Sequence, residues 1–483
     1  MAVACDARAH TRKQARRCTR CLSKRTQRVP ESSECLFVNR LAWTLSYREQ
    51  NSFQIYFSFT GHRHFDAYFT LLSMTLPSEN PSPKPDCSKC PSLVSSFVDT
   101  FVDFVVGRQI LGPNPSASAP AASEKTGTTS PIVTRVPAAE RLIAVGDIHG
   151  DLQKAKEALQ IAKVMDENEK WIGGKTVVVQ VGDVLDRGSD EIKVFYLLEK
   201  LKGEARKQGG DVHIMNGNHE IMNVEGDFRF VDRGGFAEFG EWAKWFKLGN
   251  AIKEQCSGLE KPRDFFADIP AHYPENQKAR MAALRPGGPI SSRFLAAHPT
   301  VLVVGQSVFV HGGLLPSHSN HGLEKINEEV RQWILGEKQW YGPDFLHGRD
   351  ALVWLRKFSN ERENQCDCAL LEESLNALPG SKRMVVGHTI QESVGINAVC
   401  GNKVVRVDVG MSKGCGDYAP EVLEIRDDKE LTVLSRSGAL KLMDDEQLAA
   451  ALRKYRGRSG LASLLLAPEP KVKTKLPAKM QTA

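Results

Sequence analysis

Short apolar segments alternate with amphipathic stretches through the middle of this chain, from about residue 139 to residue 440. The first three apolar segments are RLIAVGD (141–147), TVVVQVGD (176–183) and DVHIMNGN (211–218). They are rich in the β-branched residues that favour strands. The stretches between them place apolar residues near a 3.6-residue period, which is typical of helices. Strands that alternate with helices predict an α/β domain over residues 139–440.

Side chains that can bind metal ions follow the ends of the predicted strands. The first three strands end in GDIHG, GDVLDRG and GNHE, and two later strands, at 307–313 and 383–389, end in HGG and GHT. A glycine beside a polar residue is usually only a turn. Because the carboxyl ends of strands in an α/β sheet meet at one crevice, the five groups can instead share one site.

The chemistry of these side chains favours a centre with two metal ions. Carboxylate, amide and imidazole groups together suit Mn, Fe or Zn, and the lack of cysteine argues against a structural zinc site. Two such ions about 3.5–4 Å apart share a carboxylate and a water, which supplies hydroxide near neutral pH for the hydrolysis of phosphate esters. His219 is suited to protonate the leaving oxygen and Asp186 to orient His219. Arg187 offers a guanidinium group to the phosphate.

In this order, the motifs GDIHG, GDVLDRG, GNHE and HGG resemble those of the phosphoprotein phosphatase family of metallophosphoesterases. VVGHT and VDVGMSKGCG stand where the eukaryotic branch has its RAH and SAPNY motifs, so the bacterial-like branch is closer. With SSFVDTFVDF ahead of the domain, the chain is similar to the plant Shewanella-like protein phosphatases of the second group. The resemblance implies a calcineurin-like α/β fold with a central β-sandwich flanked by helices. It also implies metal-dependent hydrolysis of phosphomonoesters on serine, threonine or tyrosine of phosphoproteins.

The resemblance further implies a set of site residues. One metal ion is expected on Asp147, His149 and Asp183, and the second on Asp183, Asn218, His311 and His388, with Asp183 as the bridge. His219 and Asp186 are the expected acid pair, and Arg187 is expected on phosphate. A second phosphate-binding arginine is expected before the last histidine. We choose Arg356, in VWLR, with Arg349 as its competitor.

Two other functions compete with this prediction. A dinucleoside-polyphosphate or other small phosphoester hydrolase would use the same metals, but it usually lacks the carboxylates that Asp186 and Glu220 supply here. A regulatory or nucleic-acid-binding protein could use the arginine-rich N-terminus. That hypothesis leaves the general acid unexplained, and 64 basic residues nearly balance 58 acidic ones, so we expect no nucleic-acid partner. Charged residues interrupt every apolar run well before the ~20 residues that cross a bilayer, so no transmembrane segment is expected.

Four segments lie outside the motifs or interrupt them. Residues 1–73 are expected to be disordered or an artefactual extension. Residues 74–138 are expected to hold an amphipathic helix and a linker rich in proline, serine and alanine. Residues 223–297 form an aromatic-rich insertion, which we interpret as a helical layer with its own small core or as a lid over the site. Residues 441–483 are expected to form a short helix and a tail.

The helix at 92–107 repeats apolar residues at helical spacing. Leu93, Phe97, Phe101 and Val105 form one stripe, which predicts a helix that docks on the catalytic domain.

The eleven cysteines, in a chain without a secretory signal peptide, are expected to be mostly reduced. Cys87 and Cys90 form a C-x-x-C pair that could meet a redox partner, although reduced bystanders are the simpler interpretation. Cys366 and Cys368 are expected to be exposed and reduced. The cytosol is the default compartment, and a C-x-x-C pair beside an amphipathic helix leaves the mitochondrial intermembrane space as the alternative.

Overall fold

The structure is a computed structural model. It describes residues 41–48, 52–59, 69–71, 84, 86–88, 91–111, 132–338, 341–360, 365–392 and 394–443. The linker at 112–131 and the helix expected after residue 443 lie outside the described residues. The chain divides into two units, Met1–Pro83 and Lys84–Ala483.

The first unit contains three described strands. β1 (Leu41–Arg48), β2 (Ser52–Phe59) and β3 (Phe69–Leu71) form an antiparallel sheet in that order. The sequence predicts no ordered element here, and the structure differs on this point. LAWTLSYR and SFQIYFSF alternate apolar with small or polar residues, and this two-residue period favours strands.

Two six-stranded sheets form the centre of the second unit. Their strands are β4 (Arg135–Val136), β5 (Arg141–Val145), β6 (Val177–Gln180), β7 (Asp211–Ile214), β8 (Val301–Val304), β9 (Ser307–Val310), β10 (Arg383–Val386), β11 (Asn397–Val399), β12 (Val404–Arg406), β13 (Val422–Arg426), β14 (Glu430–Ser435) and β15 (Gly438–Leu442). One sheet has the order β15-β14-β13-β5-β6-β7 and the other β11-β12-β10-β9-β8-β4. Parallel pairing joins β5, β6 and β7 in the first sheet, and β9, β10 and β12 in the second. The predicted β-sandwich is confirmed.

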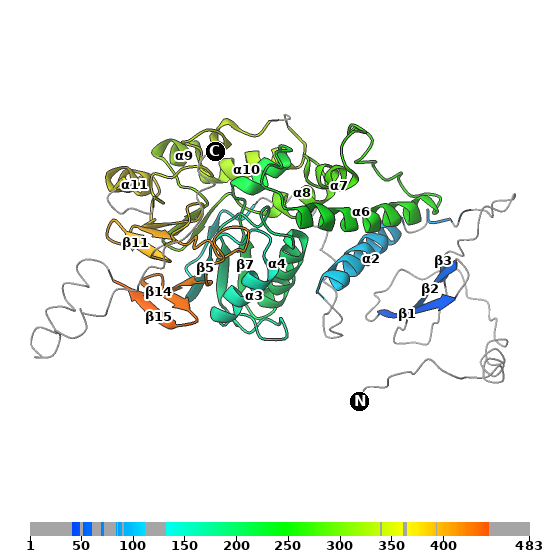
Figure 1. Ribbon diagram of the computed structural model, residues 1–483, viewed down its shortest axis with the longest axis horizontal. Helices are drawn as coiled ribbons and strands as arrows, with labels where there is room; N and C mark the ends of the chain where they lie inside the picture. Colours follow the sequence, from blue (N-terminus) through cyan, green and yellow to red (C-terminus); the bar gives the residue numbers. More distant parts are fainter. Residues whose placement is uncertain are drawn as a thin grey trace, which may run out of the picture. The chain divides into compact units, whose positions relative to one another are not determined.

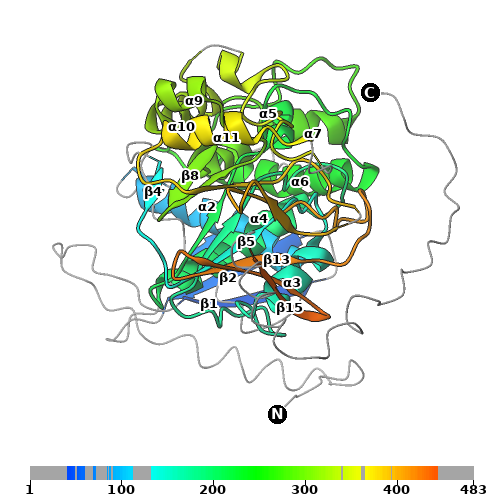
Figure 2. The same ribbon diagram turned by 90° about the vertical axis from the view of Figure 1, so that its left-hand side faces the viewer.

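Helices cover both sheets. They are α2 (Pro91–Leu111), α3 (Leu152–Ile161), α4 (Glu191–Arg206), α5 (Asn218–Val224), α6 (Arg233–Glu254), α7 (Glu275–Leu284), α8 (Pro289–Arg293), η1 (Leu295–Ala297), α9 (Pro316–His321), α10 (Leu323–Ile334), η2 (Asp344–Leu346) and α11 (Cys368–Asn376). α4 packs on β7 and α10 packs on β8. Figure 2 shows α9 and α10 on one side of the sheets and α3 on the other. Among the described helices, none is long and apolar enough to cross a membrane.

Helix α2 lies along α6 of the insertion (Figure 1). Its buried apolar side chains are Val98, Val102 and Val106, whereas Phe97 and Phe101 of the predicted stripe are only half-buried. The reason is a close approach of the two helices: a Cβ atom on Gly249 of α6 would lie 2.5 Å from a methyl group of Val102. Val102 and Val98 therefore fill the contact at Gly249.

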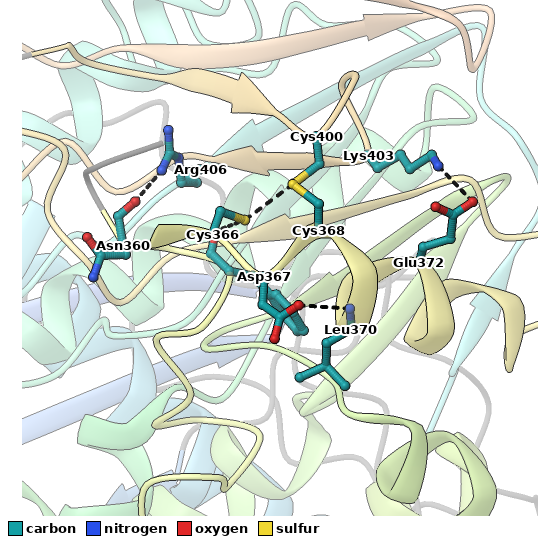
Figure 3. The surroundings of a disulfide bond; sticks show 10 residues. Asn360, Cys366, Asp367, Cys368, Leu370, Glu372, Cys400, Lys403 and Arg406 are labelled. Atoms are coloured by element: carbon teal, nitrogen blue, oxygen red, sulfur yellow. Dashed lines mark hydrogen bonds and ion pairs between the residues drawn. A yellow bond between two sulfur atoms is a disulfide. The ribbon is translucent and has the colours of Figure 1, made fainter. Parts of the chain in front are cut away.

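Two disulfides join four of the six described cysteines, which corrects the expectation of a reduced thiol at Cys87 and at Cys368. Cys87 is bonded to Cys256, 169 positions away, and not to Cys90, which lies outside the described residues. Cys368 is bonded to Cys400, 32 positions away, so it is not a reduced thiol. Figure 3 shows the Cys366 thiol beside that bond, with its Sγ 3.4 Å from the Sγ of Cys400. Because the bonded partners are distant in sequence, the C-x-x-C and C-x-C spacings gave no sign of them.

The Cys87–Cys256 bond connects the segment before α2 to the end of α6, so its removal should weaken the docking of α2. Loss of a native disulfide that closes a long loop costs roughly 2–5 kcal/mol. We expect Cys256→Ser to lower the free energy of unfolding by about 2–4 kcal/mol in urea titrations. With reductant present, the variant and the natural protein should be equally stable. Non-reducing peptide mapping that finds Cys87 linked to Cys90 would contradict the pairing.

Candidate metal centre and active site

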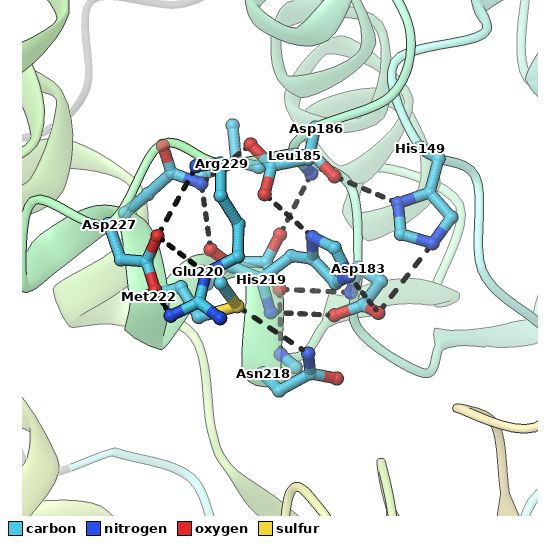
Figure 4. A network of polar contacts seen from close by, with 12 residues as sticks. His149, Asp183, Leu185, Asp186, Asn218, His219, Glu220, Met222, Asp227 and Arg229 are labelled. Carbon is cyan, nitrogen blue, oxygen red and sulfur yellow. Dashed lines mark hydrogen bonds and ion pairs between the residues drawn. The ribbon is translucent and has the colours of Figure 1, made fainter. Parts of the chain in front are cut away.

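Asp183, directly after β6, is at the centre of a buried cluster of imidazoles (Figure 4). Its Oδ2 lies 3.2 Å from His311 Nε2, 3.7 Å from His149 Nε2 and 3.8 Å from His219 Nε2. Burial alone would raise the pKa of Asp183, but His311 and His219 outweigh it and hold the pKa well below its ordinary value. This carboxylate therefore remains charged, and it would help to hold a cation in this cluster.

The six predicted ligands come from both sheets. Asp147 and His149 follow β5, Asp183 follows β6 and Asn218 follows β7, whereas His311 follows β9 and His388 follows β10. Asn218 Oδ1 lies 2.9 Å from His311 Nε2, and the His388 amide donates to Asp147 Oδ2 at 3.1 Å. The edges of the two sheets thus bring the six side chains together: five of them line a cavity of about 360 Å³, and His311 lies behind it, against Asp183 and Asn218.

The imidazoles are oriented as metal ligands usually are. His149 Nδ1 and His311 Nδ1 each lie 2.9 Å from a backbone carbonyl oxygen, that of Leu185 and that of Val181. A carbonyl only accepts, so each Nδ1 carries a proton, and Nε2 is the ring atom that faces Asp183.

His388 gives a further indication that cations belong in this site. Its Nε2 is buried and has no hydrogen-bond partner among the described residues. An unpaired buried nitrogen is costly, and a bound cation would satisfy it. The donor set and this orphaned nitrogen both fit metal ions.

The backbone around the ligands adopts an unusual conformation. His149, Asp183, Asp186, Arg187 and His388 all have φ between 46° and 70°. Residues other than glycine rarely adopt this left-handed region, and such strain gathers at functional sites. In this structure it turns the chain at the strand ends so that the side chains point into the cavity.

Two glycines permit the close approach of backbone and ligand. A Cβ atom on Gly217 would lie 2.2 Å from Asp183 Oδ1, and one on Gly387 would lie 2.4 Å from Asp147 Oδ1. Both distances are shorter than any real contact. Glycine is therefore required before Asn218 and before His388.

Glu220 has a structural role that the sequence analysis did not assign. Its carboxylate accepts hydrogen bonds from the amides of Asp183, Val184, Leu185 and Gly217, at 2.7–3.0 Å. Burial and the charge of Asp183 raise the pKa of Glu220 to about 7, although the amide donors act in the opposite direction. The signal was present: a glutamate at the third position of a helix often binds the N-cap amide, here that of Gly217.

His219 and Asp186 form the predicted pair. His219 Nδ1 lies 2.6 Å from Asp186 Oδ2. Burial lowers the pKa of His219, but the charge of Asp183 and the bond to Asp186 outweigh it, so the net shift is upward. The imidazole lines the cavity, where it can hold a proton near neutral pH.

Both chosen arginines line the same cavity. Arg187 has a buried Nε without a hydrogen-bond partner among the described residues, and its guanidinium lies 5.2 Å from the ring of Phe230. Arg356 donates to the His388 carbonyl at 3.1 Å and to Thr389 Oγ1 at 2.9 Å. The competitor, Arg349, lines the neighbouring cavity instead.

Five cavity residues were missed by sequence reasoning: Phe230, Trp354, Ile390, Asp408 and Cys415. Asp408 could have been found, because VVRVDVG repeats the pattern of an apolar strand followed by aspartate and glycine. Burial raises the pKa of Asp408 to about 6. The aromatic pair had no such signal, since these side chains reach the cavity from irregular segments.

Replacement of Glu220 tests its role as a scaffold. At pH 8, above the carboxyl pKa of about 7, Glu220→Gln presents an amide donor to backbone donors. We expect a loss of about 2–4 kcal/mol in the free energy of unfolding, measured by urea titration. Glu225→Gln is the control, since it removes only a surface pair with His347, worth about 0–1 kcal/mol. Equal losses in the two variants would refute the scaffold role.

Comparison with known proteins identifies the family. Residues 140–392 match the calcineurin-like phosphoesterase family. The chain is 52% identical over 372 residues to Shewanella-like protein phosphatase 2 of Arabidopsis thaliana, covering 75% of this chain and 92% of that one. It is 30% identical over 299 residues to Shewanella-like protein phosphatase 1 of Plasmodium berghei (strain Anka), covering 60% and 72%. A cold-active protein-tyrosine phosphatase of a psychrophilic Shewanella species aligns with 84% of this chain and 100% of its own, at 19% identity and a TM-score of 0.47, which is too loose to support an argument. The chain therefore belongs to the calcineurin-like phosphoesterase family and, within it, to the Shewanella-like protein phosphatases.

Proposed function

We propose that this chain is a metal-dependent phosphatase that removes phosphate from serine, threonine or tyrosine side chains of phosphoproteins. The observation that supports it most directly is one cavity lined by a charged carboxylate, an aspartate-paired histidine and two arginines. A metal centre alone could serve many reactions. The combination of phosphate-binding arginines with a proton donor suits the cleavage of a phosphomonoester with a poor leaving group.

The proposed cofactors are two divalent or trivalent ions, namely Mn, Fe or Zn. Asp147, His149 and Asp183 would hold one ion, and Asp183, Asn218, His311 and His388 the other. When bound, such ions polarise the phosphoryl oxygens and lower the pKa of a coordinated water. The orientation of His149 and His311, with Nε2 toward Asp183, and the charged carboxylate of Asp183 suit this set of ligands.

The chain's own groups bind the phosphate and supply the proton. Arg187 has an unsatisfied Nε at the cavity, and Arg356 is held there by the His388 carbonyl. Each guanidinium can donate to phosphate oxygens as the charge on them grows.

Protonation of the leaving oxygen is the task of His219. Its Nδ1 is held by Asp186, so Nε2 faces the cavity and can transfer its proton. Serine and threonine alkoxides are poor leaving groups without that proton. The Asp186 carboxylate stabilises the charged form of the ring before the transfer.

The two disulfides are relevant to the cell compartment in which the protein resides. Disulfides persist in oxidising compartments and are rare in the cytosol. The bonds at Cys87 and Cys368 therefore favour the mitochondrial intermembrane space over the cytosol, with a redox partner that acts at Cys87. Mass spectrometry that finds the Cys87 and Cys256 thiols reduced in protein from intact cells would contradict this proposal.

Phosphopeptide hydrolysis tests the function directly. We expect turnover with Mn²⁺ that stops after chelation and returns when Mn²⁺ is added. Asp183→Asn should abolish turnover, because the bridge is lost. His219→Asn should reduce kcat by about 10²–10⁴-fold, as loss of a general acid predicts. His347→Asn, a histidine paired with Glu225 on the surface, is the control and should keep full activity.

The same assay separates the competing function. Hydrolysis of dinucleoside polyphosphates without turnover of any phosphoserine, phosphothreonine or phosphotyrosine peptide would replace the protein-phosphatase proposal by the small-phosphoester alternative. Turnover that survives chelation would refute the metal-dependent mechanism.

A further inference from the structure

Arg280 is a buried cation beside the site, and the mechanism above does not use it. It lies in α7, within the insertion, and its side chain is 0% exposed. Its guanidinium Nη2 lies 3.0 Å from Asp186 Oδ1 and 2.9 Å from Glu191 Oε1, and Nη1 bonds to the other oxygen of Glu191. Its Nε donates to Asn223 Oδ1 at 2.8 Å. Each nitrogen of this guanidinium thus binds Asp186 of the acid pair or a residue that also bonds to Asp186.

The contacts divide the two oxygens of Asp186 between two tasks. Oδ2 binds His219 Nδ1 at 2.6 Å, whereas Oδ1 accepts from Arg280 and, at 2.8 Å, from Asn223 Nδ2. Asn223 Nδ2 also donates to the His219 carbonyl at 2.9 Å. The carboxylate therefore cannot rotate without breaking bonds on both sides. Its direction fixes the plane of the His219 ring.

The insertion provides the environment that makes these bonds strong. The guanidinium lies 4.6 Å from the ring of Phe239, 5.7 Å from that of Phe228 and 5.9 Å from that of Phe236. Aromatic rings exclude water, and a low local dielectric strengthens charged hydrogen bonds. Burial of an arginine is costly unless its partners are also fixed. Here the partners are Asp186 and Glu191, both fully buried.

We propose that Arg280 is a positioning residue for protonation of the leaving group. It holds Asp186, which holds His219 with Nε2 facing the cavity. The aromatic-rich insertion is then part of the catalytic apparatus, in addition to being a helical layer. This inference rests on the proposed role of His219 as general acid.

A purely structural role of Arg280 would be to neutralise Glu191. The two roles predict different effects of the leaving group on the loss of kcat. A positioning role affects only the step in which the leaving oxygen takes a proton. Phenyl phosphate needs that proton and p-nitrophenyl phosphate scarcely does, because its leaving group is stable as an anion.

The experiment compares both esters in Arg280→Met, Arg280→Lys and a matched control. We expect Arg280→Met to lower kcat on phenyl phosphate by about 10–100-fold. On p-nitrophenyl phosphate we expect a loss of less than about 3-fold, with KM unchanged for both esters. Arg280→Lys should recover part of the loss, because an ammonium can still reach one carboxylate.

Arg293→Met is the control, since Arg293 is a partly buried arginine of the same insertion that pairs with Asp103 of α2. Any loss in this variant should be equal on the two esters. An equal loss on both esters in Arg280→Met would show that Arg280 is only structural and would overturn the inference. If thermal denaturation shows that Arg280→Met does not fold, Asn223→Ser takes its place, because it removes the other donor to Asp186 Oδ1. The ratio of its kcat losses on the two esters then decides between the two roles.

His219→Asn, assayed in parallel, separates this inference from the function on which it rests. A strong leaving-group dependence in His219→Asn without one in Arg280→Met would overturn only the role of Arg280. If His219→Asn lowers kcat by the same factor on both esters, the proposal that His219 is the general acid is wrong.

Discussion

The hydrogen bonds of one buried carboxylate, Glu220, determine how the two central loops of the site meet. The turn after β6 has left-handed φ values at Asp183 and Asp186, so its amides cannot be paired in a helix or a strand ladder. Glu220 reaches across from the start of α5 and accepts from that turn and from Gly217 together. This contact adds four hydrogen bonds to those by which His219 already joins the loop with Asp183 to the loop with Asn218.

The same contact explains why three adjacent residues, Asn218, His219 and Glu220, have three separate tasks. They form the first turn of α5, and successive side chains on a helix point about 100° apart. Asn218 thus faces His311, His219 faces Asp186 and the cavity, and Glu220 points back under the β6 turn. A strand or an extended loop could not distribute three neighbours in this way, because its side chains point to only two sides.

Much of the fold and the candidate site could be predicted because the relevant signals are local. Apolar runs predicted β5 to β10 as strands, and the rule that strand ends converge placed ligands from 147 to 388 in one site. What the sequence did not indicate depends on contacts between distant residues. Arg280 meets Asp186 over 94 positions, and Cys87 meets Cys256 over 169. The left-handed φ values were also hidden, since aspartate and histidine adopt them only where surrounding bonds enforce them.

The insertion shows how such distant contacts combine. α2 is joined to it by the Cys87–Cys256 bond, by the ion pair of Asp103 with Arg293 and by the valine contact at Gly249. Within the insertion α6 packs on α7, and Arg280 of α7 reaches Asp186. Packed interiors transmit displacement because they have few voids in which to absorb it. Helix α2 is thereby connected, through α6 and α7, to the carboxylate that orients the proton donor, although none of its described side chains lines the cavity.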